Sequence, residues 1–327
     1  MVTSLLNGWT TSDYNALEKG VLIARHRIVE SGVFSDENLA RIIDRHPPED
    51  FSINTMGQDT SVFEWREGDR GNLPGRELLE LVSTHRFWIN CRKMPKHHPE
   101  VRDVVDRIYD ELENTVPEFQ AKERTANLLI SSPGALVHYH VDVPVNMLWH
   151  IKGRKRVWIY PHFDERFLSS EVAERVCVGE YSEDVPYDAR LDDYALVVDP
   201  EPGQVVTWPQ LTPHRVQNLE GLNVSLSTEH MNPRAIRRSG VYRANHFLRH
   251  TLNWTPQSTD ITGPIGWAKQ KLARVVSLVK SRRSGPRKSN TYPKTFVVET
   301  NAPNGYLLIS DTDPLSTARH LRQETSA

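Results

Sequence analysis

The sequence has little cysteine and no long apolar run. Only Cys91 and Cys177 occur among 327 residues, which excludes a disulfide framework and a cysteine-ligated zinc cluster. No window approaches the roughly 18 consecutive apolar residues that a membrane span needs. The first ten residues also lack the basic and apolar segments of a secretory signal. We therefore expect a cytoplasmic protein without a membrane span.

A strong net charge of either sign is also absent. The 40 basic and 42 acidic residues leave a formal net charge of −2, which gives no general attraction for nucleic acid or anionic membranes. Hydrophobic residues make up 38% of the chain and charged residues 25%. This composition fits a globular protein with a substantial core.

Three regions of different pattern succeed one another along the chain. Residues 1–120 are predicted to be mostly helical and to pack as a flank on the middle region, because apolar residues recur at helical spacing in 36–43, 78–82 and 101–112. Residues 47–77 between these segments are polar and rich in Gly, Asp and Pro. We predict that they form loops.

The middle region, residues 121–235, is predicted to form the core of the fold from short strands. Turn residues separate six runs with β-branched or aromatic content, at 127–131, 135–140, 146–151, 156–160, 204–208 and 223–228. Lys152-Gly153-Arg154 is predicted to be a hairpin turn, and the acidic stretch 171–199 a long loop that covers the substrate. Many short strands favour a sandwich or barrel over a parallel doubly wound sheet.

The last region, residues 236–327, is predicted to be an extension. It contains a basic amphipathic segment, residues 267–288, with eight lysines and arginines from position 269 onward and no acidic residue. Such a segment can contact nucleic acid, acidic protein or a membrane surface. A solvated helix followed by a flexible loop is the simpler interpretation, which we prefer. Residues 295–299 and 306–309 are predicted to form an appended hairpin.

The motif that points to chemistry is His140-Val141-Asp142, together with His214 in the run Trp-Pro-Gln-Leu-Thr-Pro-His. Two imidazoles and one carboxylate are the ligand set of a mononuclear iron(II) centre that leaves positions open for oxygen and a co-substrate. Alternate side chains of a strand share a face, so His140 and Asp142 can hold one ion. His138 has the same parity and competes for the ligand role.

A lysine in a strand-like run adds to this pattern. Lys155 shares a strand face with Val157 and Ile159, and in a partly dry barrel its ammonium group could bind the carboxylate of an organic acid lying on the metal. The competing interpretation is an exposed strand lysine, because basic residues stand on both sides of it.

These residues lie in two segments that resemble the cupin-like, jumonji-type oxygenases dependent on iron(II) and 2-oxoglutarate. The first runs from His140 through Lys152-Gly-Arg-Lys155 to Pro161, and the second from Pro202-Gly203 through His214 to Asn218. The pattern is most similar to that of the asparaginyl hydroxylase acting on hypoxia-inducible factor. The resemblance covers roughly residues 127–231 and leaves both flanks unassigned.

The resemblance implies a double-stranded β-helix (jelly-roll or cupin) barrel, mainly β with helical flanks, whose catalytic core is residues 121–235. It implies that iron(II) is held by His140, Asp142 and His214. Lys155 matches the family lysine that pairs with the distal carboxylate of 2-oxoglutarate.

Three further residues are candidates for binding this co-substrate. Asn146 matches a family asparagine near the co-substrate, while Ser225 and Ser227 stand on the last core strand. Ser227 replaces an inward asparagine that is common there, and Val137 replaces a hydroxyl residue that often contacts 2-oxoglutarate. These departures affect the contacts to the co-substrate and leave the metal ligands intact.

The activity that the resemblance implies uses O2 and 2-oxoglutarate, releases succinate and carbon dioxide, and hydroxylates an unactivated C–H bond. No catalytic side chain beyond the metal centre is expected. A protein side chain or small metabolite is favoured as substrate over nucleic acid contacted through 267–288, and a homodimer stays open because C-terminal extensions in this family often mediate dimers. Two alternatives also stay open: a cupin-type metalloenzyme that does not use 2-oxoglutarate, and a non-catalytic barrel that acts as a binding or regulatory module.

Overall fold

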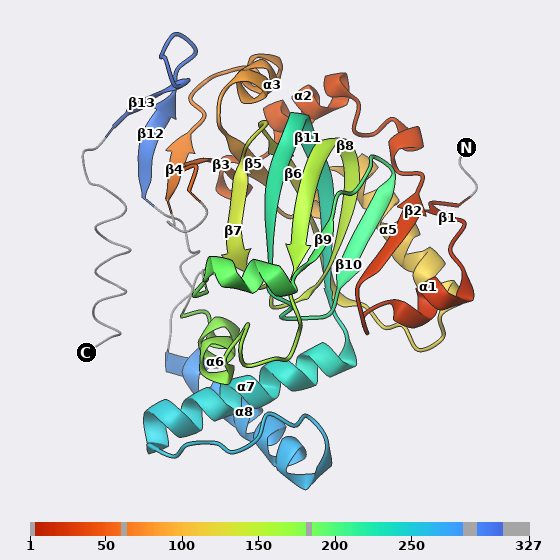
Figure 1. The fold of residues 1–327 in the computed structure, drawn as a ribbon, viewed down its shortest axis with the longest axis vertical. Coiled ribbons are helices and arrows are strands. Elements are labelled where there is room, and N and C mark those ends of the chain that lie inside the picture. The colour runs from red at the N-terminus through yellow and green to blue at the C-terminus, as the bar shows by residue number, and fades with distance from the viewer. Residues whose placement is uncertain (1–3, 60–63, 181–184, 284–292, 310–327) are drawn as a thin grey trace.

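The computed structural model describes residues 4–59, 64–180, 185–283 and 293–309. In these residues 13 strands join into one hydrogen-bonded sheet that curls into a barrel, with helices outside it and at one end (Figure 1). The predicted architecture, mainly β with helical flanks, is confirmed.

Two long, bent strands build the barrel: β8 (Val145–Ile159) and β11 (His214–Met231) pair antiparallel along nearly their whole length. The first half of β8 and the second half of β11 lie in one layer, with β6 (Lys122–Ser131) and β10 (Gln204–Trp208). Their other halves lie in a second layer, with β7 (Leu136–His140) and β9 (Leu196–Val198). Two layers of four segments each are the arrangement of a double-stranded β-helix.

The bend of β8 corrects the prediction of a hairpin turn at residues 152–154. The strand continues through these residues, and Gly153 has a φ of +86°. A Cβ atom on Gly153 would lie 2.7 Å from the carbonyl oxygen of Leu222 in β11, so only glycine allows this close approach of the two strands. The local sequence is that of a turn, but the long-range pairing with β11 keeps both halves in one strand.

We expect Gly153→Ala to lower the free energy of unfolding by about 2 kcal/mol or more, because it adds a strained backbone conformation and a backbone clash. Gly221→Ala is the matched control: its φ is +69°, but no atom lies within 4 Å of the added Cβ. The loss there should be about 1 kcal/mol. Urea unfolding followed by circular dichroism measures both, and equal losses would contradict the close-approach explanation.

The N-terminal flank contributes five strands to the sheet. The sequence pattern predicted this flank to be mostly helical and did not predict these strands. Beyond β10 lie β2 (Leu22–His26) and β1 (Leu6–Asn7); beyond β6 lie β5 (Trp88–Cys91), β3 (Phe51–Met56) and β4 (Trp65–Asp69). The prediction of loops across 47–77 is therefore wrong at β3 and β4. Their polar composition concealed them, because one face of each strand lines a cavity with side chains such as Asn54 and Glu67.

The predicted helices of this flank are present and cover the outside of the sheet. The three predicted segments correspond to α2 (Asp36–Arg45), α3 (Gly75–Thr84) and α5 (Pro99–Thr115). The structure adds two shorter helices, α1 (Thr11–Ala16) and α4 (Met94–His97), and short 3-10 turns at Val29–Ser31 and Pro48–Asp50. Ser35 caps the N-terminus of α2, where its hydroxyl accepts a hydrogen bond from the backbone N–H of Asn38. The apolar stripes of α2, α3 and α5 enter one core with the outer face of the sheet.

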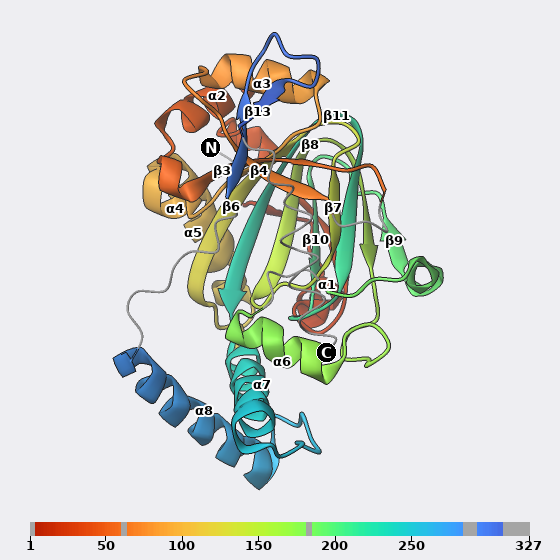
Figure 2. The ribbon, with the colours of Figure 1, turned by 90° about the vertical axis from the view of Figure 1, so that its left-hand side faces the viewer.

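Residues 171–199, predicted to be a long loop, also contain regular structure. Helix α6 (Ser170–Val178) and a 3-10 helix (Ala189–Tyr194) precede β9, while residues 181–184 lie outside the described part. Helix α6 buries Ala173, Val176 and Cys177 in a hydrophobic cluster that is separate from the main core. In Figures 1 and 2 it crosses one end of the barrel, next to α7.

The C-terminal extension consists of two helices and the predicted hairpin. Helices α7 (Pro233–Leu252) and α8 (Gly263–Arg283) pack on each other and project away from the barrel (Figure 2). Strands β12 (Lys294–Val298) and β13 (Tyr306–Leu308) pair as predicted, and β12 adds to the edge of β4. Residues 284–292, which include the end of the basic segment at 284–288, lie outside the described residues. Within the described residues, none of the helices has the length and apolarity to cross a membrane.

Candidate metal centre

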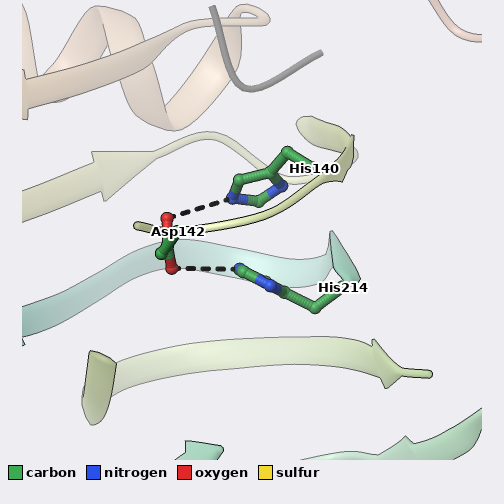
Figure 3. A group of neighbouring side chains, drawn as sticks. All are labelled: His140, Asp142 and His214. Atoms are coloured by element: carbon green, nitrogen blue, oxygen red, sulfur yellow. Dashed lines mark ion pairs between the residues drawn. The ribbon is translucent and has the colours of Figure 1, made fainter. Parts of the chain in front are cut away.

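The three predicted metal ligands meet in one group (Figure 3), and the cavity that they line is also lined by residues of α6. His140 is the last residue of β7 and His214 the first of β11, and the two are partners in the register of these strands. Asp142 comes after β7 in a loop, so it reaches the site without the shared strand face that the sequence suggested. The candidate ligand atoms all lie within 4.8 Å of one another.

The carboxylate of Asp142 lies between the two imidazoles. Its Oδ1 atom is 3.9 Å from Nε2 of His140, and its Oδ2 atom is 3.5 Å from Nε2 of His214 (Figure 3). Both distances are longer than hydrogen bonds. They suit donor atoms that surround one ion, because ligands bound at about 2.1 Å are roughly 3–4 Å from each other.

The backbone fixes which nitrogen of each imidazole faces the site. Nδ1 of His140 is 2.8 Å from the carbonyl oxygen of His138, and Nδ1 of His214 is 3.0 Å from that of Thr212. A carbonyl oxygen only accepts, so each Nδ1 carries the hydrogen and each Nε2 keeps a lone pair for a metal. Burial, together with nearby His140, lowers the pKa of His214 to about 4, which keeps this ring neutral near pH 7.

His138, the competitor for the ligand role, does not belong to this group. His138 lines the same cavity as the three candidate ligands, while its backbone carbonyl orients His140. The structure therefore distinguishes His140, a candidate ligand, from His138, which supports it. Strand parity alone could not distinguish the two residues.

Asn146 and Ser227 form a hydrogen-bonded chain behind Asp142. Nδ2 of Asn146 donates to Oδ2 of Asp142 at 2.9 Å, and the hydroxyl of Ser227 donates to Oδ1 of Asn146 at 3.1 Å. Both residues also line the cavity. Ser225 is placed differently: its hydroxyl is 3.2 Å from Nδ1 of His150, and it is not among the residues lining the cavity.

Lys155 is buried, with 4% of its surface exposed, so its interpretation as an exposed strand lysine is wrong. As predicted, it shares a strand face with Val157 and Ile159, whose side chains pack in the barrel interior with Trp208. Burial lowers the pKa of Lys155 to about 7, and no acidic side chain offsets this effect. A buried cation without a counter-ion is costly, and an anionic ligand would relieve that cost.

A cavity of about 670 Å³ opens on the three candidate ligands. Part of its wall comes from the barrel, including Asn146, Trp208 and Ser227, and part from α6 and α7. Another part comes from β3, β4 and β5 of the flank, which sequence reasoning missed. The period-two alternation in Ser52-Ile-Asn54 and Trp88-Ile-Asn90 was the signal that could have located these strands.

Residues 69–228 match the family of cupin-like domains. The match runs from the end of β4 into β11 and includes His140, Asp142 and His214. The matched segment also includes β5 and the helices α3 to α5.

Among solved structures, the chain is similar to those of YcfD from Escherichia coli, which is described as a ribosomal oxygenase. The match to one of these structures covers 83% of this chain and 68% of the YcfD chain, with 14% sequence identity and a TM-score of 0.48. Another, in complex with cobalt and 2-oxoglutarate, covers 81% and 65%, with 14% identity and a TM-score of 0.43. The chain spans about two thirds of the length of these proteins. No protein with a curated description matches the sequence.

Proposed function

We propose that this protein is an oxygenase dependent on iron(II) and 2-oxoglutarate, which uses O2 and releases succinate and carbon dioxide. The observation that supports it most is the convergence of His140, Asp142 and His214 with both Nε2 lone pairs directed into the site. Two imidazoles and one carboxylate suit ferrous iron and leave positions open for two further ligands.

Each side chain of the site then has a defined task. His140, Asp142 and His214 would hold the iron, which supplies oxygen activation and C–H oxidation when bound. Asn146 holds the carboxylate of Asp142 in place, and Ser227 orients Asn146. Such outer contacts typically change metal affinity or activity by about 10–100-fold when they are removed.

Lys155 supports the choice of a dicarboxylate co-substrate. Its buried ammonium group would pair with the distal carboxylate of 2-oxoglutarate, which removes the cost of burying either charge alone. Because Lys155 is buried, little water screens this pairing. A metalloenzyme that does not bind an organic acid has no use for such a lysine.

Hydroxylation of a C–H bond in a protein side chain or a small metabolite is the proposed outcome. The direct test is to incubate the full chain with iron(II), ascorbate, O2 and 2-oxoglutarate and to quantify succinate. We expect slow succinate formation even without a substrate. Stoichiometric iron binding without any consumption of 2-oxoglutarate would instead favour a metalloenzyme of another type, and failure to bind iron a non-catalytic barrel.

The affinity for 2-oxoglutarate should fall as the pH rises above 7. The charged form of Lys155 binds the dianion, and in the ligand-free protein its pKa is about 7. Above that pH, binding must take up a proton, so the dissociation constant should rise by up to about tenfold per pH unit. Calorimetry at pH 8.5 in buffers of different ionisation enthalpy should show proton uptake close to one. A pH-independent affinity between 7 and 9 would contradict this role.

A further inference from the structure

Asp142 differs from the two candidate imidazoles in the way its backbone is held. His140 ends β7 and His214 begins β11, and these strands pair, whereas Asp142 follows β7 in a loop. Asn146 holds the carboxylate of Asp142, but a side chain on a loop also moves with its backbone. The position of this carboxylate therefore depends on what holds the main chain of residues 142–143.

The segment between β10 and β11 holds this main chain at two successive carbonyl groups. The backbone N–H of Leu211 donates to the carbonyl oxygen of Asp142 at 3.1 Å. Nε2 of Gln210 donates to the carbonyl oxygen of the next residue, Val143, at 2.7 Å. One contact comes from the backbone and the other from a side chain, so a substitution at residue 210 removes only the second.

Leu211 has a backbone conformation that residues with a side chain rarely adopt. Its φ is +58°, in the left-handed region. Its side chain is 1% exposed and packs in the same hydrophobic cluster as α6. Strained backbone that persists because its surroundings hold it is typical of functional sites. Here the strained residue is the one whose N–H reaches Asp142.

The amide group of Gln210 connects this loop to helix α7. Besides the contact to Val143, Nε2 lies 3.2 Å from the carbonyl oxygen of Ala235 and 3.0 Å from the hydroxyl of Ser239, one turn later on α7. Oε1 accepts from Nη1 of Arg238 at 3.3 Å. Carbonyl oxygens only accept and a guanidinium group only donates, so these neighbours fix the orientation of the amide.

This connection is closed to water. Gln210 is 2% exposed, and Ala235 and Ser239 are each 1% exposed. A buried carbonyl oxygen that loses its donor costs free energy, so loss of the amide would shift the loop of Asp142, the start of α7, or both. Within the described residues, Gln210 does not line the cavity. It can therefore act on the metal centre only through the residues that it holds.

We infer that Gln210 is a positioning residue that couples α7 to the candidate metal ligand Asp142. It ties the main chain next to Asp142 to the first two turns of α7, so the C-terminal extension contributes to the metal centre although none of the three candidate ligands belongs to it. This inference rests on the proposed function, since the position of Asp142 matters through the metal that it would hold.

The test measures metal binding without catalysis. The full chain, without iron or 2-oxoglutarate, is titrated calorimetrically with Mn²⁺. Gln210→Met nearly keeps the side-chain volume and removes the hydrogen bonds, and we expect it to raise the dissociation constant of Mn²⁺ about tenfold, at the lower end of the effect of contacts that support metal ligands. Gln270→Met is the matched control, because Nε2 of Gln270 on α8 donates to the carbonyl oxygen of Ile261 at 3.0 Å. It should retain the affinity of the wild type.

Thermal unfolding of the metal-free variants separates metal affinity from stability. Both variants should unfold at a lower temperature than the wild type, since each leaves a backbone carbonyl oxygen without its side-chain donor. Only Gln210→Met should also lose affinity for Mn²⁺. A loss of the same size in Gln270→Met would mean that Gln210 has a merely structural role.

A second measurement needs no variant, and it decides the question if Gln210→Met does not fold. Coupling is reciprocal, so Mn²⁺ that binds more tightly because α7 is held must in turn stabilise α7. We expect Mn²⁺ to slow the exchange of backbone amide hydrogens in residues 235–239 of the wild type, with little change in residues 270–275 of α8. In Gln210→Met this protection should be lost.

The two proposals fail in different ways. If Gln210→Met bound Mn²⁺ with wild-type affinity, or if Mn²⁺ left amide exchange at 235–239 unchanged in the wild type, the coupling would be wrong and the oxygenase would stand. If Asp142→Ala bound Mn²⁺ as tightly as the wild type, the assignment of the metal centre would be wrong, and the coupling with it.

Discussion

Asp142→Ala should eliminate succinate formation, with a fall in 2-oxoglutarate turnover of more than about a hundredfold. Removal of outer contacts to a metal ligand already costs about 10–100-fold, and Asp142 is itself a ligand in the proposed centre. The variant leaves two imidazoles whose Nε2 atoms are still oriented by backbone carbonyls, so weak metal binding can persist.

The measurement pairs a succinate assay with iron content after anaerobic reconstitution. Asp106→Ala is a suitable control, because it removes an exposed carboxylate on α5. It should retain the turnover and the iron content of the wild type. If Asp142→Ala retained wild-type turnover, the metal would have to be held elsewhere, and the assignment of the centre would be wrong.

Lys155→Ala should raise the concentration of 2-oxoglutarate required for half-maximal turnover by roughly a hundredfold or more, while iron still binds. Loss of one partner of a buried ion pair costs about 3 kcal/mol or more, and every 1.4 kcal/mol corresponds to a factor of ten. Lys152→Ala, on the same strand but half-exposed and paired with Asp36, should leave this requirement nearly unchanged.

The same lysine should destabilise the protein in the absence of ligand. Its pKa falls from 10.5 to about 7 on folding, so between these values the unfolded chain binds more protons than the folded one. Stability should therefore rise with pH through this window in the wild type, and Lys155→Met should lose this contribution. If Lys155→Ala left the 2-oxoglutarate requirement unchanged, Lys155 would not belong to the co-substrate site.

The sequence allowed the chemistry to be predicted further than the fold around it. His140, Asp142 and His214 were identifiable because their residue types and spacing carry information without any structure. The sequence left the burial of Lys155 undecided, because the basic residues on both sides of it were equally compatible with an exposed strand. Its burial in the folded protein, which depends on tertiary structure, decides between these interpretations.

Features that depend on long-range strand pairing were harder to predict from the sequence. Gly153 lies in a local pattern typical of a turn, and only the approach of Leu222 shows why a bent, continuous strand needs glycine there. The flank strands β3 and β4 were hidden for a related reason. Their inward residues, such as Asn54 and Glu67, are polar because they line a cavity, so hydrophobic periodicity was weak.

The most direct test of the proposed centre is a crystal structure of the protein with Mn²⁺ and 2-oxoglutarate, with the metal located by its anomalous scattering. We predict one ion about 2.1 Å from Nε2 of both His140 and His214 and from one oxygen of Asp142. The co-substrate should lie on that ion with its far carboxylate at Nζ of Lys155. An ion bound outside these three residues, or a co-substrate whose carboxylates avoid Lys155, would contradict the account.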